Sequence, residues 1–260
     1  MRTRLEKLEF AASGQQLEGT LLAPATVLPG ILFVHGWGGS QEQDLEHARQ
    51  AAGLGCTCLT FDLSGHEKTL VQQESVTRQQ NLDDLVAAYD VLVGRPGVDK
   101  ESIAVTGFSY GGYLAAILTS LRPVRWLALR APALYPDAGW ELPKRALNRD
   151  PGLADYRQQK IEWKDNRALN ACAMFRGDAL IVESEHDTLV PHAVIDNYIT
   201  AFAKPRSKTA RIIAGADHAL ADDKHQRDYT AILINWLTEM IVGARADEAA
   251  KTAGKTAQAA

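Results

Sequence analysis

The pentapeptide Gly107-Phe-Ser-Tyr-Gly111 places one serine hydroxyl among glycines, where two kinds of local structure meet. The residues from Ile103 onward are apolar and β-branched, as in a buried strand, and those up to Leu121 have the length and composition of a packed helix. A strand that turns abruptly into a helix needs small residues two positions either side of the tip, because larger side chains would collide. The pattern therefore predicts that Ser109 is an exposed nucleophile, with a plain Gly/Ser turn as the alternative.

A serine hydroxyl is a weak nucleophile near neutral pH, so it needs a positioned general base. Among the seven histidines, His218 is the best candidate because its loop, Ala214–Leu220, directly follows the last apolar strand. His35 belongs to a glycine-rich loop, and His186 adjoins acidic residues. The remaining four lie in helical or polar contexts that favour exposure: His47, His66, His192 and His225.

The imidazole of a general base also needs a carboxylate to fix its tautomer and stabilise its protonated form. Asp187 is the candidate, since its loop follows the strand that precedes the one leading to His218. Three other acids compete with it: Glu183, Glu185 and Asp217. Asp217 immediately precedes the histidine, so its side chain should point away, and Glu185 is the strongest rival.

A tetrahedral intermediate needs hydrogen-bond donors for its oxyanion. The backbone N–H of Tyr110, the residue after the nucleophile, is the first candidate. The second is the N–H of Trp37 in the loop His35-Gly-Trp-Gly-Gly39, whose glycines leave backbone amides open. By itself this loop is also compatible with an ordinary strand-to-helix turn, and its place after the first apolar central strand favours the oxyanion hole.

The elements that must position these residues alternate along the chain. Two extended segments, 5–11 and 16–22, are joined by a turn at Ser13-Gly14 and predict an antiparallel pair. Apolar strands at 31–35, 56–61, 103–108, 126–130, 179–183 and 209–213 then alternate with helical patterns, the last of them at 224–242. Such alternation predicts an α/β fold with a mainly parallel sheet covered on both faces. Ligands of such sheets bind beyond the C-terminal strand ends, where all the candidate residues fall.

Two segments depart from this rhythm. Residues 132–175 contain four prolines and many charges and predict a small helical cap insertion, and residues 243–260 predict a flexible tail. The globular domain is thus expected to span 1–242. Aromatic side chains of the insertion either line a pocket or anchor the insertion onto the domain, and both readings stay open.

Composition limits the classes of function. A length of 260 residues suits one large α/β domain, and a net charge of −4 favours neither nucleic acid nor a membrane surface as a partner. The basic run at Lys144, Arg145 and Arg149 is expected to be a solvated face.

Membrane and targeting segments are not expected from the sequence. No segment reaches about 20 apolar residues, the length that spans a bilayer, and no signal peptide is expected. Three cysteines form no disulfide framework, which predicts a cytoplasmic protein, and no metal-type spacing or cofactor motif is found. The sequence does not indicate an oligomeric state.

Taken together, these motifs resemble the α/β-hydrolase superfamily. The matching pieces run in family order from His35-Gly-Trp-Gly-Gly39 through Asp62-Leu-Ser-Gly65, Gly107–Gly111 and Asp187-Thr-Leu-Val-Pro191 to Asp217-His218. The resemblance implies a roughly eight-stranded sheet with a cap inserted after the sixth strand. The opening segments resemble dienelactone-hydrolase-like and prolyl-oligopeptidase-like members more weakly. Dienelactone hydrolases use a cysteine where this chain has Ser109. His66 also departs from the family, because many relatives have a second glycine there.

The expected function is that of a carboxylic-ester hydrolase acting on small molecules through an acyl-enzyme, with Ser109, Asp187 and His218 as catalytic residues. A peptidase or amidase, a thioesterase and an acyltransferase would use the same residues. A binding protein that keeps only the fold is the alternative from another class, but such proteins usually lack a triad member, and none is missing here.

Overall fold

The computed structural model describes residues 3–12, 15–24 and 28–258, and side chains within 28–244. The chain opens with an antiparallel pair, β1 (Thr3–Ala12) and β2 (Gln15–Pro24), in register from Thr3↔Pro24 to Ala12↔Gln15. The pairing confirms the predicted hairpin, whereas the turn expected at Ser13-Gly14 lies outside the described residues.

The main sheet has six parallel strands in the order β4-β3-β5-β6-β7-β8. Their bounds are β3 (Leu28–Val34), β4 (Thr57–Thr60), β5 (Val98–Phe108), β6 (Trp126–Arg130), β7 (Asp178–Ser184) and β8 (Ser207–Ile213). The chain order reverses beside β3, because β4 lies on one side of it and β5 on the other. Because all six strands are parallel, their C-termini lie along one edge of the sheet, and an α/β fold binds its ligands there.

The expectation of a roughly eight-stranded sheet is wrong, because the sheet has six strands. The opening hairpin accounts for the difference, since β1 and β2 pair with each other and form a sheet of their own. Strand β4, at the edge of the main sheet, is four residues long. It therefore has few backbone groups that could pair with a ten-residue strand such as β2.

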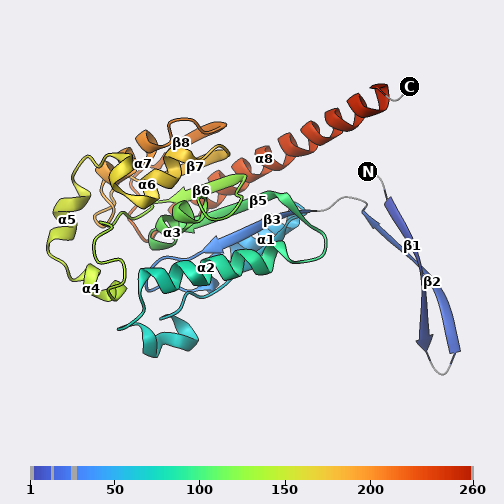
Figure 1. Ribbon diagram of the computed structural model, residues 1–260, viewed down its shortest axis with the longest axis horizontal. Helices are drawn as coiled ribbons and strands as arrows, with labels where there is room; N and C mark the ends of the chain where they lie inside the picture. Colours follow the sequence, from blue (N-terminus) through green and yellow to red (C-terminus); the bar gives the residue numbers. More distant parts are fainter. Residues whose placement is uncertain (1–2, 13–14, 25–27, 259–260) are drawn as a thin grey trace.

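Helices cover both faces of the sheet (Figure 1). One face packs on α1 (Leu45–Gly53) and α8 (Asp223–Gln258); the other packs on α2 (Arg78–Val93), α3 (Tyr110–Leu118), α6 (Arg167–Met174) and α7 (His192–Ala201). Side chains along each central strand point alternately to the two faces of the sheet. In β3, Leu32 and Val34 join the core on the α3 side, whereas Ile31 and Phe33 join the core on the α8 side. This period of two is the pattern of a strand buried on both faces.

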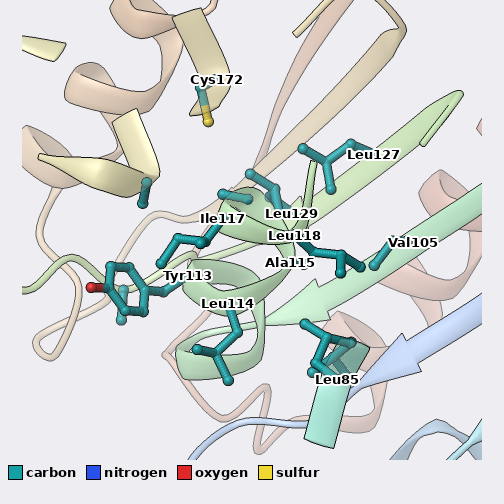
Figure 2. Packing of buried hydrophobic residues seen from close by; sticks show 14 of the residues in the cluster. Leu85, Val105, Tyr113, Leu114, Ala115, Ile117, Leu118, Leu127, Leu129 and Cys172 are labelled. Atoms are coloured by element: carbon teal, nitrogen blue, oxygen red, sulfur yellow. The ribbon is translucent and has the colours of Figure 1, made fainter. Parts of the chain in front are cut away.

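Helix α3, which follows the serine turn, is buried at all nine positions. Figure 2 shows its apolar side chains, among them Leu114, Ile117 and Leu118, packed with Val105 and Leu129 of the neighbouring strands. Each fully buried leucine contributes about 2 kcal/mol of transfer free energy. The packing fixes the helix, and with it the residue at its N-terminus, firmly on the sheet.

Between β6 and β7 lie the short helices α4 (Lys144–Asn148), α5 (Gly152–Arg157) and η3 (Trp163–Asp165), followed by α6, which packs on α3. Helices α4 and α5 lie beyond the ends of the strands (Figure 1). Lys144 corrects the expectation of a solvated basic face, because it is fully buried. Arg145 and Arg149 stay at the surface beside Glu74. Three aromatic rings explain the difference, because the Lys144 ammonium lies over those of Trp37, Tyr110 and Tyr135.

Two shorter 3₁₀ helices complete the element list, η1 (Gln41–Asp44) and η2 (Glu67–Gln72). Helix α8 continues to Gln258, beyond the predicted helix end at 242, so residues 243–258 are helical and the flexibility of this segment stays a prediction. Within the described part of the chain, no helix is both long and apolar enough to cross a bilayer.

Candidate active site

Ser109 occupies a strained turn between β5 and α3. Its backbone has φ 51° and ψ −114°, a region that residues with a Cβ rarely adopt. The turn is possible because the neighbouring glycines let three backbone segments touch. A Cβ on Gly107 would lie 2.6 Å from the carbonyl oxygen of Gly111, and a Cβ on Gly111 would overlap the carbonyl oxygens of Val34 and His35. The strained backbone of Ser109 thereby holds the serine at the N-terminal end of α3.

Replacing Gly111 with alanine is expected to destabilise the protein by about 3 kcal/mol, because the new methyl group would push against backbone atoms that cannot rotate away. Chemical denaturation of the purified variant measures this free energy. Gly53, whose added Cβ would have no atom within 4 Å, is the matched control for the glycine-to-alanine change. Equal stability of G111A and G53A would show that the turn tolerates a side chain.

The structure brings Ser109, His218 and Asp187 together from three loops. His218 Nε2 lies 3.0 Å from Ser109 Oγ, and His218 Nδ1 lies 2.6 Å from Asp187 Oδ2. Ser109 follows β5, Asp187 follows β7 and His218 follows β8. This continuous hydrogen-bonded series is the arrangement in which an imidazole can take the serine proton and a carboxylate can stabilise the resulting imidazolium.

Asp187 is held rigidly by its own loop. Its Oδ1 accepts hydrogen bonds from the backbone N–H groups of Leu189 (2.9 Å) and Val190 (2.7 Å), which leaves Oδ2 for His218. Its side chain is 2% exposed, so water competes little for these bonds. A carboxylate fixed in this way presents one oxygen to the imidazole in one orientation.

The rival acids point elsewhere. Glu183 faces His192 Nδ1 at 2.7 Å, Glu185 accepts the backbone N–H of Gly215 at 2.7 Å, and Asp217 accepts that of Ala221 at 2.9 Å. His186, the other histidine of this loop, is exposed and lies beside Glu185. None of these three acids is hydrogen-bonded to His218.

Replacing Asp187 with asparagine is expected to lower kcat for an ester by about 10³- to 10⁴-fold, because the amide can donate to Nδ1 and favour the wrong tautomer. Glu185→Gln is the matched control, since it makes the same change of carboxylate to amide on a side chain that contacts Gly215 instead. Steady-state kinetics of both variants decide the assignment. Comparable losses in the two would contradict the role of Asp187.

Two buried histidines hold the loop that follows β3. His35 Nε2 accepts the backbone N–H of Leu63 (3.0 Å), and His66 Nε2 accepts that of Gly38 (2.9 Å). The expectation that His66 is exposed is therefore wrong: it is 2% exposed, because its ring packs edge-on against His35 and Trp37. Burial, together with His35, lowers the pKa of His66, which keeps the imidazole neutral and able to accept.

The loop after β3 and the turn at Ser109 bring the side chains of the two candidate oxyanion donors, Trp37 and Tyr110, into contact. The ring of Trp37 packs edge-on against that of Tyr110, 5.7 Å between centres. Neither backbone N–H takes part in the turn and loop hydrogen bonds of the described residues. Gly38, next to Trp37, has φ +78°, a conformation that glycine adopts without strain. The assignment of these two amides as oxyanion donors stays a prediction, and the turns and loops of the described residues leave both of them unused.

Arg130, the last residue of β6, is a site residue that the sequence analysis did not identify. Its Nη1 donates to the backbone carbonyl of His218 (2.9 Å), and its guanidinium lies 3.6 Å over the ring of Phe108. It is 5% exposed, and burial lowers its pKa to about 10. A charged residue that ends the apolar run WLALR was the available signal. Arg130 ties the loop of His218 to the strand beside the nucleophile.

A cavity of about 640 Å³ opens at Ser109 and His218. This volume suits a small organic ligand. One end is formed by the cap insertion and the loop after β7; the other lies between α1 and α8, with lining residues that include Asp44, His47, Arg130 and Tyr229. Among the described residues, no group of three or more His, Cys, Asp or Glu side chains is placed to hold a metal ion.

Comparison with known proteins places this geometry in context. Residues 31–232 match the sequence model of the Alpha/beta hydrolase family. No curated protein matches the chain in sequence. Among solved structures, Est1E from Butyrivibrio proteoclasticus, determined with ferulic acid bound, is similar with a TM-score of 0.64 and 16% identity, over 92% of this chain and 96% of its own.

Two further structures show the range of the likeness. Dienelactone hydrolase from Anabaena variabilis has a TM-score of 0.59 and 18% identity over 92% of this chain and 99% of its own. The acylaminoacyl peptidase of Pyrococcus horikoshii has a TM-score of 0.61 and 16% identity over 92% of this chain but only 42% of its own. At these identities the similarity is one of fold.

Proposed function

We propose that this chain, which belongs to the alpha/beta hydrolase family, cleaves carboxylic esters through an acyl-enzyme on Ser109. The observation that carries the proposal is the hydrogen-bonded series from Ser109 Oγ through His218 to Asp187, with distances of 3.0 and 2.6 Å. The open cavity at the serine supplies the space for a small ester.

In the first half of the reaction, Ser109 Oγ attacks the ester carbonyl carbon while His218 Nε2 takes the hydroxyl proton. The carbonyl oxygen becomes an oxyanion, which the N–H groups of Trp37 and Tyr110 stabilise. One such donor is typically worth about 10²- to 10³-fold in rate. Collapse of the intermediate breaks the bond to the alkoxy group, which leaves as the alcohol with the proton that His218 returns to it.

In the second half, a water molecule gives a proton to His218 and attacks the acyl carbon. The second tetrahedral intermediate collapses, Ser109 recovers its proton from His218, and the carboxylic acid is released. Asp187 keeps the histidine oriented and favours its protonated form throughout. All atoms are supplied by the ester and one water, so the cycle requires no cofactor.

The main alternative is a peptidase or amidase that uses the same three residues. The likeness to an acylaminoacyl peptidase favours it, but this chain covers only 42% of that protein. Amides have poorer leaving groups than esters, so peptidases need additional control of the leaving amine. A thioesterase or acyltransferase would also use this site. The odd number of cysteines, three, favours a reducing, cytoplasmic setting for any of these activities.

A chain-length series of p-nitrophenyl esters, assayed beside short aminoacyl p-nitroanilides, tests the proposal. We expect hydrolysis of the esters with kcat/KM well above that of the anilides. A fluorophosphonate label followed by peptide mapping should modify Ser109, because the probe requires an activated serine. Faster turnover of the anilides would favour the peptidase. Failure to label Ser109, together with no turnover, would contradict the hydrolase mechanism.

A further inference from the structure

Three cationic side chains lie near the cap end of the cavity, and two of them, Lys144 and Arg157, contact Tyr135. Lys144 Nζ lies 4.4 Å from the centre of the Tyr135 ring, and the guanidinium of Arg157 lies 4.9 Å from it. Lys144 also lies over the rings of the two oxyanion candidates, 4.9 Å from Trp37 and 4.8 Å from Tyr110. Arg78 is fully buried nearby, with Nη1 at 3.4 Å from the hydroxyl of Tyr113.

Among the described residues, none of these three cations has a carboxylate partner. Lys144 donates to Asn148 Oδ1 (2.5 Å), and Arg78 donates to the backbone carbonyls of Pro136 and Ala138. The nearby acids are engaged elsewhere: Asp137 pairs with Arg167, and Asp187 is bonded to His218. Buried charges in proteins are normally paired, because an unpaired one loses its hydration without compensation.

The electrostatic neighbours of Lys144 are the Tyr135 phenol and two arginines. Burial lowers the pKa of Lys144, the hydrogen-bonded phenol of Tyr135 raises it, and the neighbouring Arg157 and Arg78 lower it further. Although burial acts to raise it, the pKa of the Tyr135 phenol is lowered, because Lys144 and Arg157 favour its anionic form. An anion placed at this end of the cavity would therefore be stabilised by its surroundings.

Arg157 presents this positive charge to the cavity. Its Nε donates to the carbonyl of Leu134 (3.2 Å) and its Nη1 to that of Leu189 (2.7 Å), so the planar guanidinium is held in one orientation. Its side chain is also hydrogen-bonded to the hydroxyl of Tyr135. Arg157, Tyr135 and Asn148 all line the same cavity as Ser109. A guanidinium held in one orientation at the wall of a cavity is suited to a carboxylate.

The opposite end of the cavity differs in charge. There Arg130 is accompanied by the carboxylates of Asp44 and Glu46, which also line the cavity. An anionic substrate would be repelled by these carboxylates and attracted to the end where the cations have none. The two ends of the cavity thus differ in charge. One end carries cations without carboxylates, the other carries both cations and carboxylates, and Ser109 lies between them.

We propose that the cap end binds a carboxylate of the substrate, so that the preferred substrates are esters that carry a second, free carboxylate. Arg157 binds this group directly, and Lys144 supplies positive charge from behind Tyr135. The inference rests on the proposed ester hydrolysis and narrows its substrate class.

The test compares monomethyl esters of straight-chain dicarboxylic acids of four to eight carbons with the matching ester amides, in which a primary amide replaces the free carboxylate. The two have nearly the same shape and differ in charge. Hydrolysis is followed by NMR detection of methanol. We expect kcat/KM for the best carboxylate ester to exceed that of its amide partner by about tenfold to a hundredfold, as a charge-assisted hydrogen bond implies.

Variants then locate the preference. Arg157→Gln should lower the ratio of carboxylate ester to amide ester by about tenfold or more, whereas Arg157→Lys, which keeps the charge, should retain part of it. Arg149→Gln is the matched control, since Arg149 belongs to the same insertion but is exposed and lies beside Glu74. An unchanged ratio in Arg157→Gln would overturn the assignment. Circular dichroism of each variant verifies its folding.

The outcomes separate this inference from the function on which it depends. Turnover of the amide esters without preference for their carboxylate partners would refute the carboxylate site and leave ester hydrolysis intact. Absence of turnover for both, with Ser109 unlabelled by fluorophosphonate, would refute the hydrolase mechanism itself. Butyrate and inorganic phosphate serve as competitors: inhibition by butyrate supports a carboxylate site, and inhibition by phosphate alone would overturn it in favour of a phosphate site.

Discussion

Replacement of Ser109 by alanine is expected to lower kcat for p-nitrophenyl acetate by about 10⁴- to 10⁶-fold. The acyl-enzyme cannot form without Oγ, and the remaining rate would come from the oxyanion donors and binding alone. The fold should survive, because alanine keeps the Cβ and the backbone conformation of the turn, and the deleted hydroxyl has one hydrogen bond, to His218.

Steady-state assays of the purified variant with p-nitrophenyl acetate measure kcat, and thermal unfolding measures the stability of the variant. The variant must be free of wild-type enzyme, since contamination of one part in 10⁴ would mask the loss. A thermal midpoint close to that of the wild type, with the activity gone, assigns the hydroxyl to chemistry. Activity within tenfold of the wild type would show that another residue is the nucleophile.

Replacement of His218 by alanine should cause a loss of similar size, because the serine would lack a base and the leaving alcohol a proton donor. His186→Ala is the control: this histidine is 70% exposed on the neighbouring loop and its contact is with Glu185. We expect His186→Ala to retain most activity. The opposite ranking of the two variants would exchange their roles.

The double variant S109A/H218A refines this test. If the two residues act as one unit, the second substitution should add little to the loss caused by the first. Losses that multiply would show that the two residues act independently. This would contradict proton transfer between them, despite the 3.0 Å that separates their atoms.

The sequence was a good guide where one short motif imposes its own geometry. The glycines around Ser109 can be predicted because each removes a side chain that would strike backbone, and the structure shows these contacts at Gly107 and Gly111. The parallel sheet was equally predictable, since its central strands are apolar on both faces. Six apolar strands and a separate opening pair were also identified from the sequence, and the expected count of about eight came from the family resemblance instead.

Other features of the site depend on contacts between segments far apart in the chain. Lys144 reads as a surface residue among charged neighbours, yet it is buried by rings from Trp37, Tyr110 and Tyr135. Arg130 contacts His218 across 88 positions of sequence. The choice between Asp187 and Glu185 likewise depended on which loop oxygen faces the imidazole, which spacing alone left open. Burial of charge by distant aromatic groups leaves no periodic signal in the sequence.

Strand β8 forms one border of the sheet and is the support of the loop that carries His218. Most of its residues are solvent-accessible, so it buries far less than β5, which carries the serine. Peripheral strands of this kind open with a smaller free energy than central ones. Mild denaturant can therefore open β8 and move His218 away from Ser109 while the central strands stay packed. Activity would then be lost at a lower denaturant concentration than the one that unfolds the whole protein.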